Sequence, residues 1–221
     1  MALFLLLIRQ EYFTQKLDHF SYLEETFRQK YYVNLDYSNK SKNLVVYIGG
    51  VQTAFKESSI KYGAHYIANE TKSVMLALEH RYFGESIPRG NLELENLKYL
   101  SVDQAIEDLA SFITQMKPLY CLDPSNCKAL MIGGSYGGSL SSWFRQKHPE
   151  LTLGSWASSA PIHLSLSLWF FNHTKKDDKS LVGNLTIPKI TIEFFFIYIY
   201  TFIDRRSKSC EVYCKLSLFD C

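Results

Sequence analysis

The residues of this chain that are best suited to covalent chemistry lie in one glycine-rich stretch. Residues 131–140 read Met-Ile-Gly-Gly-Ser-Tyr-Gly-Gly-Ser-Leu, which contains the spacing G-x-S-x-G around Ser135. In this pattern the serine takes a strained backbone conformation that exposes its hydroxyl, and Gly133 and Gly137 avoid clashes that a Cβ atom would cause. Ser135 is therefore a candidate nucleophile for attack on a carbonyl carbon.

The sequence predicts a strand before this serine and a helix after it, the two elements that would position its side chain. The apolar run 129–132 has the length of a buried strand, and an apolar helical stripe follows the serine until Pro149 ends the pattern. A strand that turns into a helix at Ser135 would aim the backbone N–H of Tyr136 at the oxygen of the attacked carbonyl. The alternative interpretation is a strand-to-helix turn with a purely structural role.

The rest of the chain alternates strand and helix patterns, which is typical of a parallel sheet with crossover helices. Residues 44–48 and 73–78 are predicted strands, and an apolar helical stripe lies between them. Residues 153–157 form the predicted strand after the candidate nucleophile and its helix. These elements correspond to the front half of an α/β sheet.

A long amphipathic helix is predicted after Ser101, which forms a capping box with Gln104. Its apolar positions share one face. They are Val102, Ala105, Ile106, Leu109, Phe112, Ile113 and Met116. The helix is predicted to turn Asp103, Glu107 and Asp108 toward water.

The chain has 221 residues and a formal net charge of +2, so we expect one domain of ordinary α/β size. Its balanced, scattered charges provide no basic surface for nucleic acid or for acidic membranes. The apolar run 190–203 contains Glu193 and is shorter than the roughly 20 residues that a membrane helix needs. No stable membrane span is therefore predicted.

Five cysteines, an odd number, leave at least one without an intrachain disulfide partner. Cys121 and Cys127 are close enough in sequence to form a small bridge. Cys210, Cys214 and Cys221 crowd the end of the chain, where the lack of a suitable fourth ligand favours ordinary thiols over a metal site. We therefore predict no metal and no cofactor.

Four N-x-S/T sequences favour passage through the secretory pathway. Their acceptor asparagines are Asn39, Asn69, Asn172 and Asn184. Residues 1–11 begin with an apolar run like the core of a signal peptide, but they lack a basic start and a clear cleavage site. This segment is interpreted as a short signal-like sequence or as the product of a misplaced start codon.

Four segments, taken in order, resemble the S28 family of serine peptidases. They are Gln15-Lys16-Leu17-Asp18-His19-Phe20, the stretch from Leu78 to Pro88, the stretch from Gly133 to Pro149, and Ala157-Ser158-Ser159-Ala160-Pro161. Four ordered matches are far more specific than any one of them. The resemblance runs from about Tyr12 to about Ser165.

The resemblance implies an α/β-hydrolase fold, of which this chain would hold the N-terminal part of a mainly parallel sheet, truncated before the end of the sheet. It implies a serine exopeptidase, either a carboxypeptidase or a dipeptidyl peptidase, that cleaves peptide bonds often next to proline through an acyl-enzyme. Ser135 would be the nucleophile, and the amides of Tyr136 and Gly50 would form the oxyanion hole. Peptide substrates, a lysosomal or extracellular location and, in full-length members, a homodimer belong to the same expectation.

The chain departs from the family in two respects. Family members usually follow the paired glycines at 49–50 with an acidic residue and another glycine, whereas this chain has Val51 and Gln52. The family is also about twice as long and places its acid and its histidine far downstream of the serine. The alternative function is therefore a catalytically inactive fragment or a peptide-binding product.

We expect no histidine of this sequence to act as the general base. His19 and His80 precede the candidate nucleophile, which is the wrong order for this fold. His148, His163 and His173 follow it but match no histidine-bearing segment of the family, and we expect them at surfaces or helix ends. His80 is expected either in a polar network at the end of its strand or as a packed structural residue.

The sequence divides into a signal-like segment at 1–11, a partial α/β-hydrolase domain at 12–168 and a divergent tail at 169–221. Part of the tail is rich in Phe, Ile, Tyr and Lys, the residues that A/T-rich noncoding sequence encodes. The tail is therefore either spurious or the start of an inserted domain. Because the run from Ile190 lacks the alternation of a strand with one buried face, we expect it to pack poorly on the preceding domain.

Overall fold

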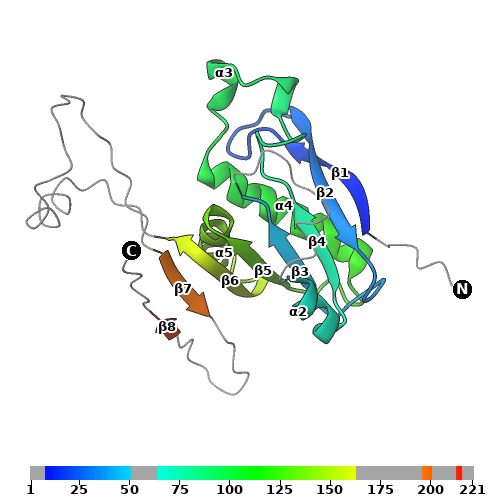
Figure 1. The fold of residues 1–221 in the computed structure, drawn as a ribbon. Helices are drawn as coiled ribbons and strands as arrows, with labels where there is room; N and C mark the ends of the chain where they lie inside the picture. The colour runs from blue at the N-terminus through cyan, green and yellow to red at the C-terminus, as the bar shows by residue number, and fades with distance from the viewer. Residues whose placement is uncertain (1–7, 51–63, 163–195, 201–212, 216–221) are drawn as a thin grey trace, which may run out of the picture.

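The computed structural model describes residues 8–50, 64–162, 196–200 and 213–215. These residues form one mixed sheet with the strand order β1-β2-β4-β3-β5-β6-β7-β8 (Figure 1). The strands are β1 Ile8–Lys16, β2 Thr26–Asn34, β3 Leu44–Ile48, β4 Val74–Leu78, β5 Ala129–Gly134, β6 Thr152–Pro161, β7 Phe196–Tyr200 and β8 Tyr213–Lys215. The helices are α2 Ala64–Thr71, the single 3₁₀ turn η1 Pro88–Gly90, α3 Leu94–Leu97, α4 Val102–Tyr120 and α5 Tyr136–Lys147.

The four central strands, β4, β3, β5 and β6, run parallel to one another. The predicted strands at 44–48, 73–78 and 129–132 are confirmed within one or two residues of their bounds. The chain moves from β3 to β4 on one side and then returns past β3 to β5 on the other. The carboxyl ends of β3 and β5 therefore mark the topological switch point, beside which α/β sheets bind their ligands. The fold is the N-terminal part of an α/β-hydrolase, as predicted.

A two-stranded hairpin extends the parallel strands on one side, and the sequence analysis did not predict it. β1 and β2 pair antiparallel from Ile8 with Asn34 to Lys16 with Thr26, and β2 continues the sheet antiparallel to β4. Residues 8–11, which the sequence analysis assigned to a signal-like segment, form the start of β1. The other residues of that segment lie outside the described part of the chain.

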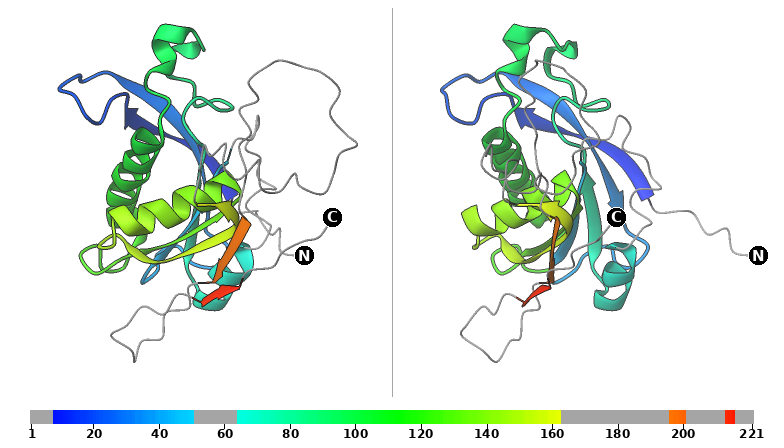
Figure 2. Two further views of the ribbon diagram at one scale, coloured as in Figure 1. Left: turned by 90° about the vertical axis from the view of Figure 1, so that its left-hand side faces the viewer. Right: turned by 60° about the vertical axis from the view of Figure 1, so that its left-hand side comes forward.

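Helices cover both faces of the sheet (Figure 2). On one face α2 packs with alternate residues of the central strands, among them Val45, Met75 and Ile132. On the other face α4 and α5 enclose a larger core, which includes Phe112 and Phe144. Because successive strand residues point to opposite faces, a fully apolar strand such as Val74–Leu78 supplies both cores at once.

The N-terminus of α4 corrects two sequence predictions. Ser101 accepts a hydrogen bond from the backbone N–H of Gln104, but the Gln104 side chain reaches Asp18 in the β1–β2 loop instead of closing the capping box. A tertiary partner has therefore replaced the local one. Val102, predicted on the buried face, is 37% exposed, whereas Ala105, three residues later on the same face, is buried.

The burial of Asp108 is the larger correction to the predicted face of α4. Its carboxylate was expected in water, yet the residue is only 1% exposed. Position 108 lies three residues after Ala105 and four before Phe112, within the stripe that faces the sheet. The carboxylate is accommodated there because a buried arginine pairs with it, as described below.

The run from Ile190, expected to pack poorly on the preceding domain, contributes residues 196–200 to the sheet. They form β7, which pairs antiparallel with β6 from Phe196 with Pro161 to Tyr200 with Trp156. An apolar, aromatic run has high strand propensity, and the outer edge of β6 offers it unpaired backbone groups. Residues 169–195, 201–212 and 216–221 of the predicted tail lie outside the described part of the chain. Within the described ranges no helix is long and apolar enough to cross a membrane.

Candidate active site

Ser135 occupies the turn between β5 and α5, at the carboxyl edge of the parallel strands. Its backbone has φ 51° and ψ −127°, which is rare for a residue with a Cβ atom. The side chain is exposed, and the backbone N–H donates to the oxygen of Ser158 on β6 at 2.9 Å. The predicted strand-to-helix turn with an outward-facing serine is confirmed.

Two glycines permit the tight approach of β5 to α5, as the sequence pattern indicated. A Cβ atom on Gly133 would lie 2.2 Å from the backbone oxygen of Gly137. A Cβ atom on Gly137 would lie 2.7 Å from the backbone oxygen of Ile48, at the end of β3. Both contacts are to backbone, which cannot move aside cheaply. The helix therefore begins directly beside the loop that follows β3.

The two predicted oxyanion residues, Tyr136 and Gly50, both lie at the start of α5. Tyr136 is the first residue of α5, and the first N–H groups of a helix have no acceptor within it. The ideal Cβ position of Gly137, one residue further, is 3.6 Å from the backbone nitrogen of Gly50. The amide of Gly50 thus lies beside the start of α5. Val51 and Gln52, which depart from the family pattern, are outside the described residues.

His80 approaches this turn from the end of β4. It is 5% exposed, its Nδ1 lies 2.7 Å from the backbone oxygen of Arg81, and its Nε2 lies 3.2 Å from the Tyr136 hydroxyl. Burial lowers the pKa of its imidazole. His80 is therefore both a packed residue and a member of a polar network, the two roles that the sequence analysis gave as alternatives.

A buried ion pair stands next to His80 in the sequence and in space. Both atoms Nε and Nη2 of Arg81 donate to the two carboxylate oxygens of Asp108, at 2.7 and 2.6 Å. The remaining N–H groups donate to the backbone oxygens of Lys16, Leu17 and Tyr99. All five donors of this fully buried guanidinium therefore have acceptors.

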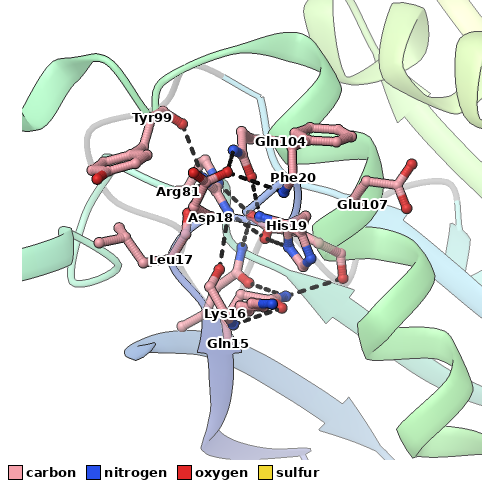
Figure 3. Close-up of polar contacts among 12 residues, drawn as sticks. Gln15, Lys16, Leu17, Asp18, His19, Phe20, Arg81, Tyr99, Gln104 and Glu107 are labelled. Carbon is pink, nitrogen blue, oxygen red and sulfur yellow. Dashed lines mark hydrogen bonds and ion pairs between the residues drawn. The ribbon is translucent and has the colours of Figure 1, made fainter. Parts of the chain in front are cut away.

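His19 joins the same ion pair from the β1–β2 loop (Figure 3). Its Nε2 is 2.8 Å from Asp108, and its backbone N–H donates to the Gln104 side chain at 3.0 Å. Figure 3 shows His19, Arg81 and Gln104 side by side between this loop and the helix α4. Sequence reasoning singled out the histidine but missed its carboxylate partner. The one available signal was an acidic residue within the apolar stripe of α4.

The loop after β4 is held by the buried carboxylate of Glu79. That carboxylate accepts hydrogen bonds from the backbone N–H of Glu85 at 3.0 Å and the hydroxyl of Ser86 at 2.7 Å. Lys30 lies 3.5 Å from the other oxygen. A Cβ atom on Gly84 would collide with this carboxylate. The segment that carries His80 and Arg81 is therefore rigidly anchored at both ends.

Among the contacts of the described residues, none joins the other histidines to Ser135. His148 lies at the end of α5 and contacts Glu107 and Glu150 through its two ring nitrogens. His65 is exposed on α2. His163 and His173 lie outside the described residues. No described histidine is seen to hydrogen-bond Ser135.

Some of the cysteines and N-glycosylation asparagines that suggested a secreted protein lie within the described residues. Cys121 and Cys127 form the disulfide that their spacing allowed. Within the described ranges no cluster of three candidate ligands could hold a metal ion. Asn39 is exposed in a turn, and Asn69 lies half-buried on α2 beside Lys72. The remaining predicted acceptors, Asn172 and Asn184, and the thiols Cys210 and Cys221 fall outside the description.

Comparison with known proteins identifies similar sequences. The model of a family described as serine carboxypeptidase S28 matches residues 15–199. A putative serine protease of Caenorhabditis elegans is 40% identical over 169 residues, covering 75% of this chain and 31% of that protein. The lysosomal Pro-X carboxypeptidases of Bos taurus and Homo sapiens are 35% and 36% identical over 166 and 156 residues, with 73% and 68% of this chain covered. These matches span about a third of each relative's length.

Solved structures resemble the chain more distantly. An esterase of Pyrococcus furiosus has a TM-score of 0.49 and 18% identity, covering 71% of this chain and 53% of that one. A ferulic acid esterase of Anaeromyces mucronatus has a TM-score of 0.46 and 18% identity, covering 72% and 61%. Similarity at this level supports no argument about function, and the fold assignment rests on the strand order described above.

Proposed function

Because the chain belongs to the serine carboxypeptidase S28 family, we propose that it carries the nucleophile of a serine peptidase at Ser135. The observation that supports this most directly is the strained, exposed serine between β5 and α5. A non-glycine residue with positive φ is costly and persists where the surrounding structure imposes it, often at a catalytic turn. The alternative of a purely structural turn would not require the hydroxyl to point outward.

The proposed reaction is hydrolysis of a peptide bond through an acyl-enzyme. A base takes the proton of the Ser135 hydroxyl as its oxygen bonds to the carbonyl carbon. The C–N bond then breaks, the amine leaves with that proton, and water hydrolyses the resulting ester. The amides of Tyr136 and Gly50 would stabilise the negative oxygen, since both lie at the start of α5.

We assign the base and its acidic partner to segments outside the described residues. The described histidines have other partners or other locations, and Asp108 is committed to Arg81. His80 is an unsuitable base, because its Nε2 faces the Tyr136 hydroxyl and burial lowers its pKa. A complete triad therefore requires groups that the described part of the chain does not supply.

The proposed substrates are peptides cleaved near a chain end, often next to proline. The names of the bovine and human relatives, lysosomal Pro-X carboxypeptidase, support this choice. A lysosomal or extracellular location is proposed on the same basis. The Cys121–Cys127 disulfide supports it, because such bonds persist in oxidising compartments, and exposed Asn39 is accessible for N-glycosylation.

Active-site labelling tests the role of Ser135. The purified chain would be treated with a fluorophosphonate, with and without added imidazole, and the labelled residue identified by mass spectrometry. Removal of the histidine from a serine protease lowers turnover by about a millionfold. We therefore expect no measurable cleavage of Pro-containing peptides by the chain alone, and labelling of Ser135 that accelerates when imidazole supplies a base.

The Ser135→Ala variant is the control and should remain unlabelled. Labelling spread over several serines, with no preference for Ser135, would refute the proposed nucleophile. Peptide binding that survives in Ser135→Ala without any labelling of the original chain would favour the inactive, peptide-binding alternative. Turnover without imidazole that His163→Ala or His173→Ala abolishes would place the base in this chain.

A further inference from the structure

We propose that His80 is a positioning residue that holds Tyr136, and with it the amide next to the nucleophile, through a hydrogen bond from the Tyr136 hydroxyl. This inference rests on the proposed function, because it gives the Tyr136 amide a task in the reaction. His80 does not touch the reacting atoms. Its role would be to fix the first turn of α5 against the end of β4.

The direction of the hydrogen bond follows from the other nitrogen of the ring. Nδ1 of His80 lies 2.7 Å from the backbone oxygen of Arg81, which can only accept. Nδ1 must therefore carry the ring hydrogen. In the neutral imidazole Nε2 is then an acceptor, so the Tyr136 hydroxyl, 3.2 Å away, donates to it. The Nε2–H tautomer would instead set two acceptors, the lone pair of Nδ1 and the Arg81 oxygen, against each other at 2.7 Å.

His80 is itself held in place by groups that cannot move easily. The Arg81 carbonyl that orients its ring belongs to the residue whose guanidinium is bound by Asp108 and by three backbone oxygens. The ring of Phe83 meets the imidazole edge to face, with centroids 5.3 Å apart. Because both its hydrogen-bond partner and its packing are fixed, His80 offers Tyr136 an anchor of defined position.

The position of Tyr136 matters because its backbone N–H can stabilise the oxyanion only if it lies close to that oxygen. Stabilisation of the developing negative oxygen requires a donor within a few tenths of an ångström of its best position. Tyr136 has one point of attachment in the helix backbone and a second in its hydroxyl, which bonds to His80 after the end of β4. Two attachments prevent the first turn of α5 from rotating and carrying the amide away.

Variants of the two residues test this role by kinetics. With imidazole present, the rate constant for fluorophosphonate labelling of Ser135 should fall by between about tenfold and a hundredfold in His80→Leu and in Tyr136→Phe. The double variant should fall no further than either single one, since both remove the same bond. His80→Gln should restore most of the rate, because its Oε1 can take the acceptor position of Nε2.

Tyr32→Phe is the matched control. It also removes a buried tyrosine hydroxyl, which donates to Gln10 on β1, far in sequence from the nucleophile. It should lower stability without changing the labelling rate. A merely structural role for His80 would give the opposite pattern, with rates that follow stability in all variants and effects that add in the double variant. That pattern would overturn the proposal.

A spectroscopic measurement distinguishes two outcomes: that His80 does not position Tyr136, and that Ser135 is not the nucleophile. In the ¹⁵N-labelled chain, nuclear magnetic resonance should show His80 with its hydrogen on Nδ1. The Tyr136 amide signal should shift in His80→Leu and stay unchanged in Tyr32→Phe. The opposite tautomer, or an unmoved amide, refutes the positioning role. If both signals behave as expected but Ser135 is never labelled, His80 positions Tyr136 as inferred and the proposed nucleophile is wrong.

Discussion

Ser135 holds a backbone conformation that a glycine would hold at lower cost. A non-glycine residue in such a region costs about 1–3 kcal/mol, and the strand before it and the helix after it impose that conformation. The side chain that creates the strain is the one that the proposed chemistry needs. Stability and function therefore compete at this position.

Replacing Ser135 with glycine should expose this competition. We expect Ser135→Gly to have a free energy of unfolding about 1 kcal/mol above that of Ser135→Ala, since glycine relieves the strain but loses more chain entropy on folding. Urea unfolding of the two variants at neutral pH provides the measurement. Equal stabilities would show that the turn is unstrained.

Arg81 and Asp108 form the buried ion pair on which the neighbourhood of His80 depends. Asp108→Asn should lower the free energy of unfolding by about 3–5 kcal/mol, because it leaves a buried guanidinium without its counter-charge. Asp103→Asn is the control on the same helix. Its carboxylate is 72% exposed and pairs with Lys147, so its loss should cost less than about 1 kcal/mol. Similar losses in the two variants would contradict the assigned importance of the buried pair.

At the scale of elements, the site depends on how closely α5 approaches β3 and β5. Side chains on the glycines at this junction would force the elements apart, and the Ser135 turn with them. The approach also brings the loop after β3 to the helix N-terminus, where an anionic oxygen is stabilised. The geometry of the candidate site is thus a property of the packed elements as well as of their residues.

Two adjacent glycines allow a matched test of this junction. Gly133→Ala should lower stability by about 3 kcal/mol or more, because its Cβ would meet the backbone of Gly137. Gly134→Ala should be tolerated, since no atom lies within 4 Å of its ideal Cβ position. Chemical unfolding and the yield of soluble protein measure both. Comparable tolerance of the two alanines would mean that α5 does not start where the structure has it.

For the molecule as a whole, buried and paired titratable groups should determine how stability depends on pH. Burial lowers the pKa of His80 from its ordinary value of 6.5, so the unfolded chain binds more protons just below that pH. Burial opposes ionisation of Glu107, but hydrogen bonds from Lys147 and His148 lower its pKa overall from 4.5. Both groups therefore favour the folded state at higher pH.

Stability should fall in two steps as the solution is acidified. The first step begins near the ordinary pKa of His80 at 6.5, and the second near that of Glu107 at 4.5, each continuing down to the lower folded-state value. Urea-unfolding midpoints measured across this range give the profile. His80→Gln should remove the first step, and Glu107→Gln should reduce the second. A first step of unchanged size in His80→Gln would assign it to another group.

The features that could be predicted from the sequence are those that depend on neighbouring residues. The turn at Ser135 follows from backbone sterics within five positions, and the central strands follow from runs of apolar residues. Both signals are local, so a single sequence contains all the information that they need. The four ordered segments added the family, which the comparison confirmed.

Contacts between residues that are distant in the sequence could not be predicted and are seen only in the folded chain. Asp108 pairs with an arginine 27 positions away, and His80 reaches a tyrosine 56 positions away. A helical periodicity assigns a carboxylate to water because it contains no information about a buried partner on another element. The hairpin of β1 and β2, the diversion of Gln104 from its cap and the pairing of β7 with β6 arise for the same reason. Each depends on contacts that form only when the chain is packed, and contacts of that kind leave no pattern in a local stretch of sequence.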